Sequence, residues 1–135
     1  MATAQIVYQG ELRTNCTHLQ SGSSIITDAP TDNHGKGEAF SPTDLIATAL
    51  GACLITTMGI VSDRDGIDLV GTKISVTKIM ESNPRRIGKI EVVINIPNQT
   101  LTADQKQKLE QTGTNCPVDK SLHPDLIREY TFNYV

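Results

Sequence analysis

One stretch of the chain, from Leu45 to Ser62, carries no charged side chain, and this limits what the protein can fold into. Ahead of it, Ser41 can cap the start of a helix, Pro42 suits the first helical position and Asp44 can complete a capping box. A helix that is apolar or small on all sides is buried, either in a bilayer or inside a protein. The sequence therefore predicts a long buried helix that ends near Gly66, a residue suited to a left-handed cap.

Two features of this stretch disfavour a membrane span. Threonine and glycine dilute its hydrophobicity, and no basic cluster flanks it. We therefore expect the central helix of a soluble protein and no membrane partner. The N-terminal residues lack a basic region followed by a long apolar segment, and this favours a cytoplasmic location.

The length and charge of the chain exclude several classes of function. A chain of 135 residues fits a single domain over 1–135 with one substantial core. Aromatic residues make up only 4% and tryptophan is absent, so Ile, Val, Leu, Ala and Met must fill that core. The net charge of −3 without a basic run argues against a nucleic-acid partner.

The rest of the sequence predicts strands on both sides of the central helix. The expected elements are a hairpin over 4–18, a third strand over 23–27, a loop over 28–40, strands over 72–80 and 87–96, a polar helix over 102–113, a short helix from Cys116, and a last strand over 127–135. This order is not a regular alternation of strand and helix. It favours an α+β fold with a mostly antiparallel sheet.

Cys116 is the first candidate reactive residue. It directly precedes Pro117, and proline is favoured in the first turn of a helix. This places Cys116 at an N-cap, where free N–H groups and the helix dipole stabilise a thiolate, and Lys120 could add positive potential. The alternative is a small buried cap residue without reactivity.

Cys53 lies in the middle of the central helix, where an inert core thiol is the more common case. Two neighbours argue otherwise. Gly51 and Gly59 cost helix stability, so they suggest that another backbone or a substrate approaches closely. The uncharged helix also suggests a covering partner subunit. Cys16, on a predicted strand among polar residues, is interpreted as a bystander.

Metal and histidine chemistry receive little support. A zinc site typically needs four ligands, often closely paired. Cys16 could pair with His18 and Cys116 with His123, but no C-x-x-C or H-x-x-x-H spacing exists. We therefore expect no metal and no cofactor. A cysteine–histidine nucleophile with His18, His34 or His123 stays open, because no motif fixes the partner.

Two motifs together resemble a known family. Ser41–Leu45 leads to Ala49–Cys53, and the segment Cys116–Leu122 begins Cys-Pro-Val-Asp-Lys. Both resemble the OsmC/Ohr family of osmotically inducible and organic-hydroperoxide-resistance proteins, and the segment Ser21–Pro30 is similar to the N-terminal sheet of that family. The resemblance covers essentially the whole chain.

The resemblance implies an intertwined α+β homodimer in which the central helices are buried between the sheets of the two subunits. In the family, the helix cysteine attacks organic hydroperoxides and the Cys-Pro cysteine resolves the sulfenic acid as a disulfide. By position, these catalytic roles fall on Cys53 and Cys116. An external dithiol would then restore both thiols.

The chain departs from the established peroxidases at one position. Those proteins place glutamate after the proline that starts the helix and pair it with an arginine, whereas this chain has Thr43 there. Asp44 follows, but one residue turns a side chain by about 100° around a helix. Arg13, Lys36, Glu38 and Asp44 are the candidates for activating the thiol, and the chain is closer to the broader OsmC-like branch.

Two functions from different classes follow. The first is a cytoplasmic, cofactor-free thiol peroxidase that reduces organic hydroperoxides through a Cys53 sulfenic acid resolved by Cys116. The alternative is a non-catalytic or redox-sensing homodimer that binds a small apolar ligand at the subunit interface.

Overall fold

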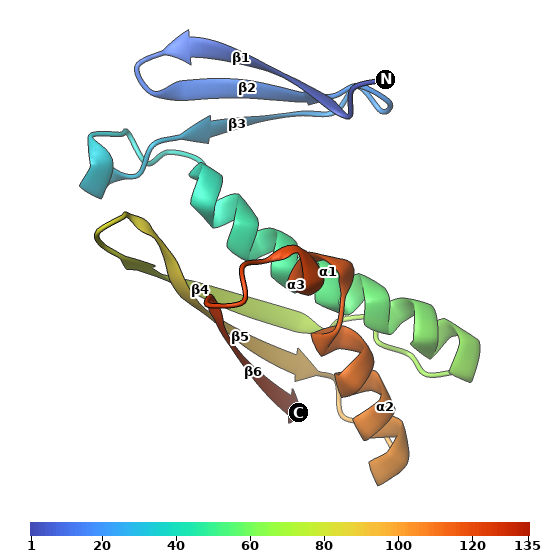
Figure 1. Cartoon of the computed structure of the whole chain (residues 1–135). Coiled ribbons are helices and arrows are strands. Elements are labelled where there is room, and N and C mark those ends of the chain that lie inside the picture. Colours follow the sequence, from blue (N-terminus) through green and yellow to red (C-terminus); the bar gives the residue numbers. More distant parts are fainter. The chain divides into compact units, whose positions relative to one another are not determined.

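The computed structural model describes residues 1–135, and they form two compact units, 1–46 and 47–135 (Figure 1). In chain order the elements are β1 (Ala4–Gly10), β2 (Arg13–His18), β3 (Ser24–Asp28), a 3₁₀ turn η1 (Thr31–Asn33), α1 (Pro42–Asp65), β4 (Lys73–Glu81), β5 (Arg86–Ile96), α2 (Ala103–Thr114), α3 (Pro117–Ser121) and β6 (Ile127–Tyr134). These elements confirm the predicted order of strands and helices, and the fold class is α+β.

The first unit is a three-stranded antiparallel meander in the order β1-β2-β3, as the sequence predicts. Its apolar side chains are poorly covered, since Ile6, Val7 and Tyr8 are each more than half exposed. The buried residues of the sheet are instead polar, Thr27 and Asp28 on β3. This sheet therefore has no apolar core of its own.

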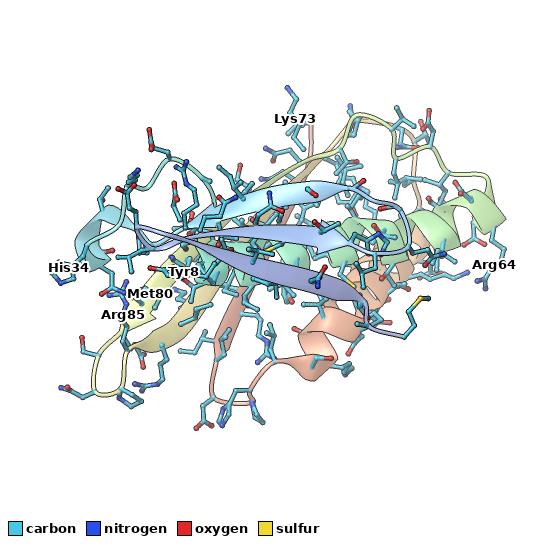
Figure 2. All side chains as sticks on the ribbon, turned by 90° about the horizontal axis from the view of Figure 1, so that it is seen from above. Tyr8, His34, Arg64, Lys73, Met80 and Arg85 are labelled. Carbon is cyan, nitrogen blue, oxygen red and sulfur yellow. The ribbon has the colours of Figure 1, made fainter.

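Helix α1 begins and ends where the sequence predicts. The side-chain oxygen of Ser41 accepts the N–H of Asp44 at 3.0 Å, and the Asp44 carboxylate accepts the N–H of Ser41 at 2.9 Å, so the capping box is present. At the other end, Gly66 has a φ of +70°. Arg64 near that end, and Lys73 at the start of β4, extend outward (Figure 2).

The length and composition of α1 would also suit a membrane span. However, Leu50, Leu54 and Met58 are fully buried in the second unit, where they form part of its apolar core. Packing of this kind is expected of the core helix of a protein. The chain thus accounts for the buried side of α1 without a bilayer.

The second sheet supplies the other half of this core. Its order is β4-β5-β6, and the four alternate residues of the central strand, Ile90, Val92, Ile94 and Ile96, have no exposed surface. Each such burial stabilises the fold by about 1.5–3 kcal/mol. The predicted apolar face of this strand is confirmed.

Two details differ from the expectation of one mostly antiparallel sheet. The strands form two separate sheets of three, and β6 pairs parallel to β5 rather than antiparallel. The parallel pair arises because the chain passes through α2 and α3 between the two strands, and a crossover of this length lets it re-enter in the same direction. Three of the four strand pairings remain antiparallel.

Glycines set how closely the other elements approach α1. A Cβ at Gly51 would lie 3.0 Å from Val76 Cγ1, so this glycine lets β4 pack against the helix. A Cβ at Gly113 on α2 would lie 2.9 Å from the Met58 side chain. The groups that approach Gly51 are side chains of β4, not the backbone or substrate that the sequence suggested. At Gly59 no atom of this chain lies within 4 Å of such a Cβ.

Candidate thiol site

Cys53 lies half-buried in the middle of α1 and packs against the apolar core of the second unit. The hydroxyl of Thr57 lies one turn further on, with its Oγ1 4.0 Å from the Cys53 sulfur. That hydroxyl donates its hydrogen to the backbone carbonyl of Cys53 at 2.7 Å. Its oxygen can therefore face the sulfur only as an acceptor of the thiol hydrogen.

Cys116 is fully buried at the N-cap of α3, ahead of Pro117. It interacts with Cys53, so the crossover between β5 and β6 brings the second thiol to the first. Burial raises the pKa of the Cys116 thiol, and its hydrogen bond and electrostatic interaction with Cys53 raise it further. The backbone N–H groups of Asp119 and Val118 favour the thiolate and oppose this change.

The predicted N-cap position of Cys116 is confirmed, and the N–H groups there favour the thiolate as predicted, but the net pKa of the thiol is raised. The N–H groups at the start of α3 do favour negative charge, yet removal from water and the neighbouring Cys53 outweigh them. Lys120 does not change this balance, because its Nζ is exposed and donates to Asn115 Oδ1 at 2.9 Å. Cys116 is therefore a thiol held neutral beside a second thiol.

A polar cluster next to Cys116 was not foreseen from the sequence. The hydroxyl of Tyr130 on β6 donates to Asp119 Oδ1 at 2.7 Å, and Arg128 Nη2 donates to the Asp119 carbonyl at 2.8 Å. Asp119 lies in the Cys-Pro motif itself, three residues after Cys116. The one available signal was the alternation of β6, which places Arg128 and Tyr130 on the less exposed face of that strand.

The first unit contains a separate charged cluster around Arg13. Its guanidinium binds both carboxylate oxygens of Asp28, at 2.7 and 2.8 Å, and Nη2 also contacts Glu38 Oε1 at 3.1 Å. Asp28 is buried and also accepts the backbone N–H of Glu38 at 3.1 Å. The guanidinium lowers the pKa of Asp28, and the carboxylate raises that of Arg13. The structure thus pairs two predicted candidates, Arg13 and Glu38, through Asp28, which sequence reasoning missed.

The other two candidates for activating a thiol have different partners. Lys36 Nζ pairs with Glu11 Oε2 at 2.5 Å on the surface of the first unit. The Asp44 carboxylate serves the capping box with Ser41, while Thr43 contacts the Ser41 hydroxyl at 3.3 Å. The Asp44 carboxylate therefore caps the start of α1.

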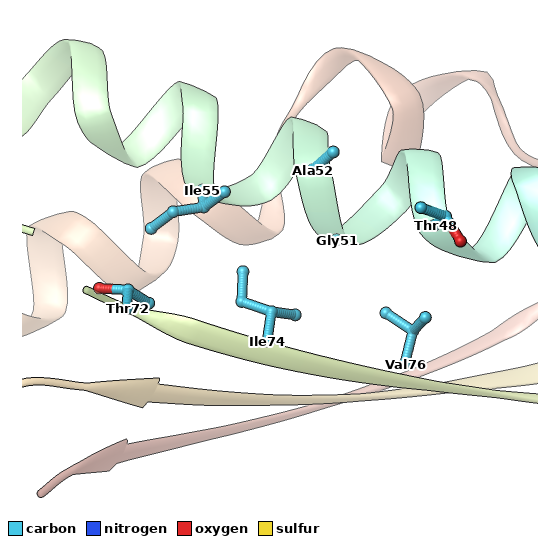
Figure 3. A pocket seen from close by; sticks show the side chains of 7 residues that line it. All are labelled: Thr48, Gly51, Ala52, Ile55, Thr72, Ile74 and Val76. Atoms are coloured by element: carbon cyan, nitrogen blue, oxygen red, sulfur yellow. The ribbon is translucent and has the colours of Figure 1, made fainter. Parts of the chain in front are cut away.

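An open cavity of about 220 Å³ lies between α1 and β4 (Figure 3). Its walls are mostly apolar and are formed by Thr48, Gly51, Ala52, Ile55, Thr72, Ile74 and Val76. Each helical residue turns about 100°, so Cys53 projects roughly 160° away from Gly51 and from Ile55. The cavity and the two thiols therefore lie on different flanks of α1.

The family model of the OsmC-like proteins matches residues 35–128, which is more than half of the chain and includes both cysteine motifs. The chain belongs to the OsmC-like family. A comparison with curated proteins gave no match. The resemblance inferred from the two motifs is confirmed.

Solved structures agree with this family. A Psychrobacter arcticus protein, provisionally described as an osmotic stress induced and detoxification response protein, is 47% identical over 98% of this chain and 96% of its own, with a TM-score of 0.94. OsmC of Legionella pneumophila, described as an organic hydroperoxide resistance protein, is 16% identical over 98% of each chain, with a TM-score of 0.72. An organic hydroperoxide resistance protein of Elizabethkingia anophelis is 18% identical over 100% and 98%, with a TM-score of 0.71. These last two show the same fold.

In this OsmC-like chain, Cys16, His18 and His123 have partners other than the two thiols. Cys16 is free on β2, where Thr14 Oγ1 lies 3.5 Å from its sulfur. His18 bonds Ser21 at 2.6 Å, and the His123 ring accepts the N–H of Asp125 at 3.0 Å. No three His, Cys, Asp or Glu residues gather where they could hold a metal ion.

Proposed function

We propose that this OsmC-like protein is a cytoplasmic thiol peroxidase that reduces organic hydroperoxides, with Cys53 as the attacking residue and Cys116 as the resolving residue. Family membership and neighbours described as organic hydroperoxide resistance proteins support a peroxide-related redox role. The observation that carries the finer proposal is the interaction of a half-buried and a fully buried free thiol in one apolar core.

The first chemical step needs one accessible thiolate. The Cys53 sulfur attacks the terminal oxygen of the hydroperoxide, the O–O bond breaks, and the alkoxide leaves as an alcohol after taking up a proton. Cys53 is then a sulfenic acid. The apolar residues around Cys53 favour an alkyl group on the substrate over hydrogen peroxide.

The second step uses the thiol that is already in place. The Cys116 sulfur attacks the sulfur of the Cys53 sulfenic acid, the S–O bond breaks, and water leaves with the thiol hydrogen. An external dithiol reduces the resulting disulfide by exchange and is itself oxidised. No metal or bound cofactor is needed for either step.

The decisive test is the intact mass of the protein after a sub-stoichiometric dose of cumene hydroperoxide, followed by non-reducing peptide mapping. We expect a loss of two hydrogens that maps to a Cys53–Cys116 link. Cys16→Ser provides the control, because it should form the same link. Unchanged thiols in the presence of remaining hydroperoxide would rule out this function for such substrates.

The proposal includes a homodimer formed through the uncharged helix. The exposed side of α1 carries Ala49, Ala52, Thr56 and Ile60, a surface without charge. The exposed apolar residues of the first sheet also call for a cover that this chain leaves incomplete. A second copy would bury both surfaces.

A pair of matched substitutions tests the dimer. Ile60 on α1 and Ile127 on β6 are 59% and 57% exposed. We expect Ile60→Asp to convert the dimer to monomer in sedimentation velocity and Ile127→Asp to leave it intact. A wild-type monomer, or equal behaviour of the two variants, would contradict the dimer through α1.

The cavity between α1 and β4 favours a second candidate function. Its apolar walls suit a small apolar ligand, although the alternative inferred from the sequence places that ligand at the subunit interface and this cavity lies within one chain. Under this second function, a small apolar compound would raise the thermal midpoint of unfolding, and Thr48→Phe, which places a larger side chain in the wall of the cavity, would abolish the rise. The peroxidase requires no such effect, so the two functions are separable.

A further inference from the structure

Asp119 connects the helix that carries Cys116 to the last strand of the sheet. Its carboxylate oxygen Oδ1 accepts the Tyr130 hydroxyl at 2.7 Å and lies 3.1 Å from Arg128 Nε. Its backbone carbonyl accepts Arg128 Nη2 at 2.8 Å. Two side chains of β6 therefore hold one residue of α3 through both its side chain and its backbone.

Arg128 also holds the segment between α3 and β6. Its Nη1 donates to the carbonyls of Leu126, at 2.6 Å, and His123, at 3.0 Å. Both Arg128 and Asp119 are largely shielded from water, and charge-assisted hydrogen bonds are stronger in such surroundings. The guanidinium thus fixes three carbonyls in the stretch that follows Cys116.

Helix α3 needs this support because it has only five residues. Its internal bonds include Lys120 N–H to the Cys116 carbonyl at 3.1 Å and Leu122 N–H to the Asp119 carbonyl at 3.3 Å. Helices of such length are not stable by themselves, so tertiary contacts set their direction. The direction of α3 in turn sets where the Cys116 sulfur points.

Tyr130 lies near the thiol as well as the carboxylate. Burial raises the pKa of Tyr130, and the hydrogen bond to Asp119 and the charge of that carboxylate raise it further. The phenol therefore stays protonated and remains a donor to Asp119 throughout the pH range in which thiols react. Its hydroxyl is available as a permanent contact for α3.

We propose that Asp119, held by Tyr130 and Arg128, is a positioning residue that fixes the Cys116 thiol against Cys53. The role belongs to disulfide formation and leaves the attack of Cys53 on an oxidant untouched. Without it, a Cys53 sulfenic acid meets a second hydroperoxide before it meets Cys116, and the sulfur gains a second oxygen as sulfinic acid while the hydroperoxide becomes an alcohol. This hydroperoxide branch rests on the proposed function, whereas the placement of the thiols does not.

The chain contains a matched control for the Tyr130 contact. Tyr134 lies on the same face of β6, and its hydroxyl donates to Glu110 Oε2 on α2 at 2.9 Å. Burial and the carboxylate also raise the pKa of Tyr134. Tyr130→Phe and Tyr134→Phe therefore each remove one phenol–carboxylate bond, and only the first bond belongs to the Cys116 helix.

The first experiment uses diamide, which oxidises two thiols to a disulfide and takes up both hydrogens as a hydrazine. It requires no peroxidase activity. We expect Tyr130→Phe to slow formation of the Cys53–Cys116 disulfide by about fivefold, the effect of losing one hydrogen bond, and Tyr134→Phe to match wild type. Asp119→Asn should slow it further. Equal rates in the two tyrosine variants, or no Cys53–Cys116 disulfide in wild type, would overturn the proposal.

The second experiment uses excess cumene hydroperoxide and mass spectrometry of the Cys53 peptide. We expect Tyr130→Phe to consume the first equivalent of hydroperoxide at the wild-type rate but to collect several times more sulfinic acid than Tyr134→Phe. A slower first equivalent would overturn the positioning role. If wild type ignores hydroperoxides while the diamide difference holds, the proposed function fails and the positioning of Cys116 stands.

Discussion

Cys53 and Cys116 interact, but their surroundings differ in almost every respect. Cys53 lies on a helix of 24 residues and keeps part of its surface open, whereas Cys116 begins a helix of five residues and has no exposed surface. One thiol can meet a molecule from solution, and the other can meet only its neighbour. For the proposed peroxidase, this difference in burial predicts that Cys53 reacts first and that Cys116 reacts second.

The largest effect is expected when Cys53, the more exposed of the two thiols, is replaced. Cys53→Ser should reduce hydroperoxide consumption to the uncatalysed level, because Cys116 is buried and its raised pKa keeps it a neutral thiol. Consumption of cumene hydroperoxide with excess dithiol measures this. Cys16→Ser serves as the control. Residual turnover in Cys53→Ser would show that Cys53 is not the attacking residue.

Removing the buried partner should have a smaller effect. Cys116→Ser should consume the first equivalent of hydroperoxide normally and then lose most of its turnover, since the sulfenic acid has no internal thiol to meet. Trapping with dimedone should label Cys53 in this variant and much less in wild type. Undiminished turnover with dithiothreitol present at wild-type levels would show that Cys116 is dispensable.

The pH dependence of stability tests whether burial raises the pKa of the Cys116 thiol. Because its pKa is raised above the ordinary value of 9.0, native protein binds more protons than unfolded protein above that pH. The free energy of unfolding should therefore fall as pH rises from about 9 towards the native pKa, and the full contribution is present below 9. Thermal unfolding of reduced wild type and Cys116→Ser between pH 7 and 10 measures this, and parallel curves would contradict it.

The smallest expected effect concerns the hydroxyl next to Cys53. Thr57 Oγ1 faces the sulfur at 4.0 Å while its hydrogen is committed to a carbonyl, so it interacts favourably only while Cys53 keeps its hydrogen. Thr57→Ala should therefore speed the first equivalent of hydroperoxide by about twofold, as loss of a weak hydrogen bond allows. Stopped-flow measurement with exposed Thr56→Ala as control tests this, and a slower reaction would mean that Thr57 assists the thiolate.

Much of the fold could be predicted because local chemistry determines it. The capping box at Ser41 and Asp44, the left-handed Gly66 and the alternating apolar residues of β5 are all visible as short patterns. The parallel pairing of β5 with β6 could not be predicted in this way. It depends on how the crossover packs, which no local pattern encodes.

The two cysteines of the candidate site could be predicted from the sequence, but the polar groups around them could not. Both cysteines belong to motifs, but the contacts of Asp119 with Arg128 and Tyr130 join segments that only the fold brings together. Likewise, Arg13 and Glu38 were candidates, while the buried Asp28 between them resembled a loop residue. The net rise in the pKa of Cys116 could not be predicted, because burial is a property of the whole core.

The parallel pairing of β5 with β6 has a consequence for the newly made chain. Strand β6 follows β5 along the chain, and the segment 97–126 between the two strands must close before any of their bonds form. Closing such a segment costs entropy and delays the pairing. Cys116 lies in that segment and is buried only in the completed fold, so we expect its thiol to be most open to oxidation in a newly made chain before β6 docks.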